Sequence, residues 1–508
     1  MYASVRGMAV EGLTPRPVTV EVDIANGLPD FIIVGLAGIE VKEAKNRVRS
    51  ALKNSGYQFP LQRITVNLAP ADLRKEGSGL DLSIAIGILA AMQELEASVL
   101  QKYVFIGELS LEGVLRPIPG VLSMAVGARN CCPQQTLVVP AENLAEARLV
   151  PELKSEGAVN LSELVKILNK QASFSVFPNA QRIKKRNQAL PDWSDIRGQE
   201  QAKRALEIAA AGGHNLLMIG PPGSGKTMLA KAFAGILPPL TPEESLEVTQ
   251  LYSLAGLLEE QGQLITERPF RAPHHCATPA GIIGGGQKLR PGELSLANHG
   301  VLFLDELPEF SREVREALRQ PLEDRKLSLI RLRERVEFPA KVSLVAAMNP
   351  CPCGFYGDSK QQCSCTPLQI SNYRGKVSGP LLDRFDIQLE VPRLSYEELQ
   401  LPKHTENSQT VQQRVLEARQ KQWLRFRSSK TNAEMTGRET KEICKLDQEG
   451  ESLLKRVFDK GYFSARAYDR ILRVARTIAD MAGSENILTG HLAEALQYRA
   501  LDRENYTY

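Results

Sequence analysis

The feature that most constrains this fold is a glycine-rich loop placed between an apolar strand and a helix. Residues 215–219 form a short apolar run, and Gly220-Pro-Pro-Gly-Ser-Gly-Lys-Thr227 follows it directly. We expect residues 228–236 to continue as a helix. In this order, glycine lets backbone N–H groups converge on phosphate oxygens, and the positive end of the helix faces the same point. The segment therefore predicts an α/β core that binds a nucleotide.

A second element carries the acidic groups that such a core needs. The apolar run Val-Leu-Phe-Leu at residues 301–304 predicts a buried strand, and Asp305 and Glu306 stand at its end. We expect Lys226 to reach the β- and γ-phosphates, with the Thr227 hydroxyl and Asp305 on Mg²⁺. Glu306 is then the base that polarises the attacking water, which predicts ATP hydrolysis with Mg²⁺ as cofactor. The predicted nucleotide-binding residues are Gly220, Gly223, Ser224, Gly225, Lys226, Thr227 and Asp305.

Three residues farther along the chain complete the predicted ATPase. Asn349 follows the apolar run 342–348, and from there a polar side chain can orient the water between the γ-phosphate and Glu306. Arg384, in Leu-Leu-Asp-Arg-Phe-Asp, fits a finger supplied to a neighbouring subunit's γ-phosphate. Arg466, in Phe-Ser-Ala-Arg at a helix start, offers a second arginine. The predicted catalytic residues are Glu306, Asn349, Arg384 and Arg466.

The order of these motifs resembles the AAA+ superfamily, and more narrowly the magnesium-chelatase-like branch that it shares with the MCM replicative helicases. Residues 381–386 resemble the finger motif of that branch, residues 464–466 its second-sensor motif, and residues 292–300 a segment before its acidic strand. Residues 251–292 resemble its insertion in helix 2, and residues 326–338 its β-hairpin before the first sensor. In related motors both insertions face the pore of a ring and touch DNA. The resemblance implies a homo-oligomeric ring, hexameric by default.

The predicted hairpin is basic. Residues 325–337 carry five basic and two acidic residues, which alternate with apolar ones. In an alternating strand Arg331, Arg333 and Arg335, here called the hairpin arginines, would share one face and could grip DNA phosphates. A solvated hairpin, or a hairpin that contacts a neighbouring subunit, is the alternative. Lys288 and Arg290 of the insertion are the second set of candidate DNA contacts.

Four of the eight cysteines gather in one short loop that contains glycine and proline. They form two Cys-x-Cys pairs, at positions 351/353 and 363/365. Four thiolates suit one tetrahedral Zn²⁺ and leave no open position, so the site would be structural. The spacing within each pair is tighter than usual, and free thiols are the alternative. The predicted zinc ligands, which directly follow the sensor residue, are Cys351, Cys353, Cys363 and Cys365. His274 and His275 of the insertion are expected to be a satisfied or solvated pair.

The N-terminal part of the chain alternates strands and helices and forms its own α/β unit. Residues 105–120, with Leu-Val-Val-Pro at 137–140, resemble the proteolytic domain of Lon proteases. That family has a nucleophilic serine and a partner lysine, and the corresponding positions here are Gly79 and Leu122. Ser78 is one residue away and has no evident lysine. Because a serine nucleophile needs an adjacent base, we predict a non-catalytic relative of that domain.

These motifs and resemblances predict four regions in the chain. Residues 1–172 are the Lon-protease-like domain, 173–192 a linker, 193–393 the AAA+ core, and 394–508 a helical C-terminal lid. End to end, the chain resembles the ComM/YifB family, which includes a DNA branch-migration helicase associated with natural transformation. The resemblance implies an ATP-dependent motor acting on branched or single-stranded DNA. A chelatase-like ATPase that remodels proteins without a DNA substrate is the alternative.

Charge and hydropathy limit the remaining possibilities. The formal net charge of the 508 residues is only +4, so DNA affinity must come from local patches. No apolar run approaches the roughly 18 residues that span a membrane, and the first residues lack a signal-peptide pattern. Eight cysteines are too few for a disulfide scaffold in a chain of this size. We therefore expect a cytoplasmic protein with no membrane partner.

Overall fold

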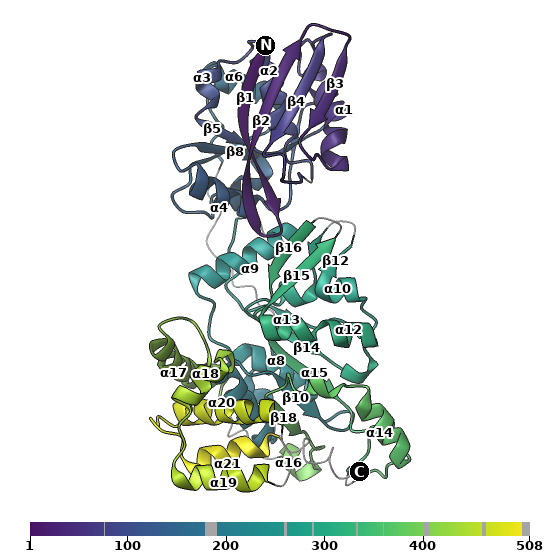
Figure 1. Cartoon of the computed structure of the whole chain (residues 1–508), viewed down its shortest axis with the longest axis vertical. Coiled ribbons are helices and arrows are strands. Elements are labelled where there is room, and N and C mark those ends of the chain that lie inside the picture. The colour runs from purple at the N-terminus through teal and green to yellow at the C-terminus, as the bar shows by residue number, and fades with distance from the viewer. Residues whose placement is uncertain are drawn as a thin grey trace.

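The structure is a computed structural model, and its long axis runs from an N-terminal α/β region to a mainly helical C-terminal region (Figure 1). A nucleotide-binding-type core lies between these two regions. Among the described residues, no helix is both long and apolar enough to cross a membrane. The described residues are 1–75, 77–177, 190–258, 262–286, 289–331, 334–358, 360–400, 406–459 and 464–499.

The N-terminal region contains two main sheets. The first has the strand order β1-β2-β4-β3, and the second is a parallel sheet in the order β5-β8-β9. Helix α2 packs between β1, β2 and α1, and all its residues are buried, which explains its almost wholly apolar sequence. The strands are β1 (Tyr2–Glu11), β2 (Thr14–Ala25), β3 (Asp30–Val34), β4 (Arg63–Ala69), β5 (Tyr103–Phe105), β6 (Glu108–Leu109), β7 (Leu115–Arg116), β8 (Thr136–Pro140) and β9 (Ser155–Ala158). The helices are α1 (Ile39–Asn54), α2 (Asp81–Ala91), α3 (Ala97–Leu100), α4 (Val121–Cys131), α5 (Leu144–Ala147) and α6 (Leu161–Leu168).

The core is a five-stranded sheet in the order β11-β14-β17-β10-β18, with every neighbouring pair parallel. Strands β10, β14 and β17 are almost completely buried, as expected for continuous apolar runs covered on both faces. Because all the strands are parallel, their carboxyl ends meet at one edge, where such sheets bind ligands. The strands are β10 (Leu216–Ile219), β11 (Phe270–Arg271), β14 (Val301–Leu304), β17 (Ser343–Met348) and β18 (Ile387–Glu390).

Helices and two small hairpins surround this sheet. The predicted insertion and hairpin lie side by side: the Gly284 backbone approaches the Leu329 side chain, and Leu289 packs on the cluster that Val336 and Phe338 form with Leu251. The helices are α7 (Glu200–Gly212), α8 (Lys226–Ile236), α9 (Pro242–Ala255), α10 (Pro279–Ile283), α11 (Glu293–Leu296), α12 (Arg312–Ala317), α13 (Arg319–Asp324), α14 (Pro367–Gly375) and α15 (Gly379–Leu382). The small strands are β12 (Gly284–Gly285), β13 (Arg290–Pro291), β15 (Lys326–Arg331) and β16 (Glu334–Pro339).

The C-terminal helices share one hydrophobic core with the sheet. Helix α17 packs on α7, α8 and α20, and its buried Val411 and Val415 join the same cluster as Leu216 and Phe233. The burial of this shared face fixes the helical region against the back of α7 and α8. The helices are α16 (Tyr396–Gln400), α17 (Ser408–Phe426), α18 (Gly437–Ile443), α19 (Gln448–Phe458), α20 (Ala465–Met481) and α21 (Thr489–Gln497).

The N-terminal region touches the core at α9 and at the β15–β16 hairpin (Figure 1). Ser253 of α9 donates a hydrogen bond to the buried carboxylate of Glu146 and accepts one from the Gly120 N–H. The β1–β2 turn reaches the hairpin, where a Cβ on Gly12 would lie 2.5 Å from Val336 Cγ1. Since Gly12 also has a φ of +62°, this close approach requires glycine.

Candidate ATPase site

The glycine-rich loop joins the carboxyl end of β10 to α8, as its sequence predicts. Gly223 and Gly225 have φ values of +77° and +91°, and a Cβ at either position would meet no atom within 4 Å. Backbone conformation, and not crowding, therefore demands glycine at these two positions. Between them, the buried hydroxyl of Ser224 has no hydrogen-bond partner in the described part of the chain.

Lys226, the first residue of α8, folds back over this loop. Its ammonium donates to the carbonyl oxygens of Gly220 at 2.6 Å and Pro221 at 3.0 Å, and to Asn349 Oδ1 at 3.4 Å. Burial lowers the pKa of Lys226, while the nearby charge of Asp305 opposes that shift. The three oxygens that hold the ammonium are all neutral, so a phosphate oxygen would be a stronger partner.

Thr227 and Asp305 come together at the carboxyl edge of the sheet. Thr227 Oγ1 donates to Asp305 Oδ2 at 2.9 Å, and the other carboxylate oxygen accepts the Glu306 N–H at 3.0 Å. The two residues belong to α8 and to the end of β14, whose strand is separated from β10 by β17. A hydroxyl and a carboxylate in contact beside a phosphate loop are the oxygen ligands that Mg²⁺ takes together with nucleotide phosphates.

Glu306 projects from a strained turn after β14. Its φ of +54° is uncommon for a residue with a side chain, and such strain is concentrated at functional sites. The side chain is 53% exposed and lines a cavity of about 470 Å³ together with Asn349 and Tyr373. Burial raises the pKa of Tyr373 to about 12, so its phenol keeps its proton.

His275 lies beside the predicted base, a contact that sequence reasoning missed. Its Nδ1 is 3.4 Å from Glu306 Oε2, and its ring centroid is 4.1 Å from that of His274. The segment that carries both histidines follows β11, which runs parallel to β14 and next to it. The available signal was therefore topological: a chain leaving a strand beside β14 emerges at the edge where Glu306 stands.

Arg384 lies at the opposite edge of the sheet from this chain's own phosphate loop. It precedes β18, and its carbonyl accepts from Asn215 Nδ2, at the amino end of β10. The guanidinium is 8% exposed and pairs with Glu323 of α13. Its Nε is buried without a partner among the described residues.

Arg466 is an exposed residue in the first turn of α20. One turn later, Arg470 donates to Asp386 at 3.2 Å, and Asp386 directly precedes β18. Residues four apart lie on one face of a helix. Arg466 is therefore near the same edge as Arg384, and the structure brings neither arginine to the phosphate loop of its own chain.

The four loop cysteines form one tight cluster. Their ligand atoms all lie within 4.8 Å of one another. The Sγ–Sγ distances are 3.3 Å for Cys351–Cys353, 3.7 Å for Cys351–Cys363 and 3.5 Å for Cys353–Cys363. A tetrahedral Zn²⁺ with bonds of about 2.3 Å would separate its sulfurs by about 3.8 Å, so the donor set fits this ion.

The cysteine loop rests directly on the phosphate loop. Gly354 has a φ of +87°, and a Cβ there would lie 2.6 Å from Pro222 Cδ. From the other side, Arg393 donates to the Pro222 carbonyl and its guanidinium lies over the ring of Phe355. The position of Pro222 thus depends on residues that flank the cysteine cluster.

The hairpin arginines do not share one strand face, so that part of the prediction is wrong. The ladder pairs Ile330 with Arg335 and Arg331 with Glu334, which puts Arg331 and Arg335 on different strands. Arg335 is exposed and pairs with Glu337 at 2.9 Å. We expected the three arginines to alternate along one strand of the hairpin, but the chain reverses direction between Arg331 and Glu334.

The other candidate DNA contacts are described only in part. Arg290 is exposed in β13, on the insertion that lies beside the hairpin. Arg333 and Lys288 lie outside the described residues, and only the backbone of Arg331 is described. Among the described side chains, the exposed cations of β13 and of the hairpin are Arg290, Lys326 and Arg335.

The N-terminal region holds no serine–lysine pair at the positions compared with Lon proteases. Ser78 donates to the carboxylate of Glu108, so its hydroxyl faces an acid. A Cβ on Gly79 would lie 3.2 Å from Ile118 Cδ1, and Leu122 is fully buried in the α4 core. The lysine that the Lon dyad uses as its base is therefore not at the compared position, which holds a buried leucine.

Comparison with known proteins matches three family models to successive parts of the chain. The model described as "Magnesium chelatase, subunit ChlI" matches residues 192–399, "Subunit ChlI of Mg-chelatase" matches residues 20–143, and "Magnesium chelatase, subunit ChlI C-terminal" matches residues 405–499. The chain is 46% identical to the competence protein ComM of Haemophilus influenzae over 99% of its length and 98% of that protein. It is 45% identical to the uncharacterized protein YifB of Salmonella typhimurium, over 99% and 97% of the two chains. A third relative, YifB of Escherichia coli, is 45% identical over 97% and 96%.

Proposed function

The chain belongs to the ComM/YifB family of magnesium-chelatase-like AAA+ proteins, and from that premise we propose that it is an ATP-driven DNA motor. Its substrate is branched or single-stranded DNA, and its process is recombination in natural transformation, in line with the name of the Haemophilus relative, a competence protein. The observation that carries the ATPase proposal is the Thr227–Asp305 contact beside the Lys226 ammonium.

ATP hydrolysis uses the groups gathered at the carboxyl edge. Lys226 exchanges its neutral carbonyl partners for the β- and γ-phosphates, while Thr227 and Asp305 hold Mg²⁺. Mg²⁺, when bound, neutralises phosphate charge during transfer. Glu306 accepts a proton from the attacking water, and Asn349, which lines the same cavity, orients that water.

His275 gives the insertion a direct connection to hydrolysis. While its imidazole stays 3.4 Å from the Glu306 carboxylate, that carboxylate has a partner other than water. The same segment continues through α10 into β12, and β12 lies against the hairpin. DNA that displaces the insertion would move His275 away from Glu306 and so free the base.

Two arginines at the amino edge support a ring. Arg384 and Arg466 lie across the sheet from their own phosphate loop, so they serve nucleotide only on a neighbouring subunit. Such head-to-tail contacts close into rings when the rotation between subunits permits, and six subunits is the arrangement that we propose. The exposed arginines of β13 and β16, on adjacent elements, then supply phosphate contacts for DNA.

We also propose that the cysteine cluster holds one structural Zn²⁺. Four thiolate ligands would leave no open coordination position for a reacting molecule, so the role of the ion would be structural. Its effect on the motor is indirect: it fixes Gly354 and Phe355 against Pro222 and Arg393, and thereby fixes the phosphate loop.

The deciding experiment measures ATP turnover alone and with single-stranded, duplex and four-way-junction DNA. We expect DNA to raise the rate, and a junction to be driven through branch migration by the wild-type chain. Glu306→Gln should bind ATP but not turn it over, since the Lys226 and Asp305 contacts remain. ATPase activity that no DNA changes, together with no DNA binding, would instead favour the protein-remodelling alternative.

A further inference from the structure

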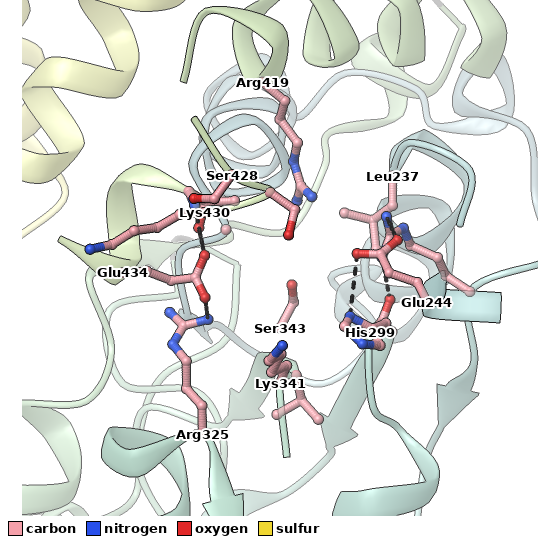
Figure 2. A pocket seen from close by; sticks show the side chains of 16 residues that line it. Leu237, Glu244, His299, Arg325, Lys341, Ser343, Arg419, Ser428, Lys430 and Glu434 are labelled. Atoms are coloured by element: carbon pink, nitrogen blue, oxygen red, sulfur yellow. Dashed lines mark hydrogen bonds and ion pairs between the residues drawn. The ribbon is translucent and has the colours of Figure 1, made fainter. Parts of the chain in front are cut away.

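A second polar pocket opens at the amino edge of the core sheet, away from the phosphate loop. Its volume is about 230 Å³. The residues preceding β10 and β14 and the first residue of β17 form its floor, and α17 with the loop after it forms its roof (Figure 2). The core therefore lines the pocket with Lys341 and Ser343, and the C-terminal part of the chain lines it with Arg419, Ser428 and Ser429.

Arg419 is a buried cation that points into this pocket (Figure 2). Its side chain is 7% exposed, and both Nε and Nη2 donate to one acceptor, the carbonyl oxygen of Ala210, at 2.9 and 2.8 Å. A guanidinium has five N–H donors, so the remaining donors are not used by that carbonyl. In the described part of the chain no carboxylate forms an ion pair with Arg419. A buried charge left without a counter-charge is costly, which points to an anion that supplies one.

The acidic residues around the pocket already form ion pairs with other cationic side chains. Glu244 is 3.0 Å from Arg268 and 3.3 Å from His299, and Glu434 is 3.0 Å from Arg325. Lys430, also in the lining, is 2.6 Å from Glu439. These pairs neutralise one another and leave the charge of Arg419 unbalanced.

The free donors are of the kinds that bind oxyanions. Lys341 lines the pocket from the strand side and has no ion pair among the described residues, and it is exposed enough to turn inward. Three hydroxyl-bearing residues, Ser343, Ser428 and Ser429, also line the pocket. A buried guanidinium, an ammonium and several hydroxyls together form a charge-assisted donor set.

We propose that this pocket binds a phosphate-class oxyanion, either inorganic phosphate or the terminal phosphate of a small metabolite. Arg419 is the principal ligand, and Lys341 with the serine hydroxyls surrounds the remaining oxygens. The volume is smaller than the 300–1,000 Å³ of pockets for drug-sized ligands, which favours a small anion over a whole nucleotide. Because core and helices share the site, a bound anion would stabilise their docking.

The test uses the full-length Lys226→Ala chain, in which the phosphate loop no longer competes for the probe. Inorganic phosphate is titrated at constant ionic strength, with chloride as the control salt, and followed by calorimetry and thermal unfolding. We expect saturable binding and a rise in Tm of about 1–2 °C at ten times Kd. Pyrophosphate and simple phosphate monoesters in parallel titrations then distinguish the free ion from a metabolite's phosphate group.

Two pocket variants connect that binding to named residues. Arg419→Met should abolish it, and Lys341→Met should weaken it about tenfold without changing the Tm measured in chloride. Lys53→Met, at an exposed lysine of α1, is the matched control and should bind as the parent does. If Arg419→Met fails to fold, the Lys341 comparison decides. No saturable phosphate binding, or equal affinity in the Lys341 and Lys53 variants, would overturn the proposal. This outcome is independent of the ATPase proposal, since the probe is tested with the phosphate loop disabled.

Discussion

Replacing Arg384 by alanine tests two possible roles of this residue. It could stabilise its own chain through an ion pair, or it could act as an arginine finger at the nucleotide of a neighbouring subunit. Among the described residues, the guanidinium has one ion pair, with Glu323, whose side chain is 58% exposed and can be solvated once Arg384 is gone. The folding cost should therefore stay near that of a partly exposed ion pair, about 1 kcal/mol or less. An arginine finger, by contrast, contributes about 10³–10⁵ in kcat. Loss of a finger should therefore lower kcat by at least about two orders of magnitude more than loss of an ion pair within the chain.

The assay compares ATP turnover, nucleotide affinity and thermal unfolding of Arg384→Ala, with Glu323→Gln as the matched control that breaks the same pair. We expect Arg384→Ala to bind ATP normally and to lose turnover, whereas Glu323→Gln should keep most of its activity. The reasoning is refuted if both variants lose activity equally and in proportion to their loss of stability.

Mixing experiments test whether Arg384 acts across subunits. Neither Arg384→Ala nor Lys226→Ala rings should hydrolyse ATP alone. In a random equal mixture, a productive interface joins an intact phosphate loop from the first variant to an intact finger from the second. About a quarter of head-to-tail interfaces meet that condition, so recovery should approach a quarter of wild-type turnover. No recovery in rings shown to be mixed would rule out a finger in trans.

Four further predictions follow from the same contacts. His275→Ala should raise ATP turnover without DNA and shrink the stimulation by DNA, because Glu306 loses its alternative partner; unchanged stimulation would count against the coupling. Purified protein should carry about one Zn per chain by metal analysis, and the Cys351→Ser, Cys353→Ser double variant should lose it; metal-free protein of full activity would indicate free thiols. Alanine at all three hairpin arginines should weaken DNA binding at every sequence alike. The slope of log affinity against log salt concentration should become shallower by about 0.7–0.9 per lost contact. An unchanged slope together with disrupted rings would show that the hairpin serves assembly. Burial lowers the pKa of His299, but hydrogen bonds and charges from two glutamates outweigh burial and raise the pKa overall. The free energy of unfolding should therefore fall as pH rises above about 6.5. In denaturant titrations, His299→Gln should flatten that pH dependence.

Local motifs predicted the parts of the site that neighbouring residues determine. The phosphate loop needs glycine at Gly223 and Gly225 because of backbone dihedrals, and such a demand is visible in a short segment. The pair after β14 is equally local, since a buried strand that ends in acids fixes where those acids emerge. The parallel sheet then followed from the strand–loop–helix order.

Contacts between distant segments were beyond the sequence. The approach of His275 to Glu306 depends on which strand lies beside β14, and the short β11 carries almost no periodic signal. Arg419 looks like one more solvated arginine of a charged helix until the packing of α17 on α7 buries it. The hairpin arginines were misplaced because alternation does not reveal where a strand reverses. In each case the missing information was tertiary.

The contact between the β1–β2 turn and the β15–β16 hairpin would couple movement of the hairpin to the N-terminal sheet. Ten residue pairs join β1 to β2, so the ribbon extends for about 30 Å from the turn at Gly12 to the chain's first residues. A tilt of the hairpin by about 10° that carried this ribbon along would displace its far end by about 5 Å. Movement too small to notice beside the nucleotide would thus be magnified at the outer end of the molecule. A small probe attached near Tyr2 would be the most sensitive place to watch the motor work.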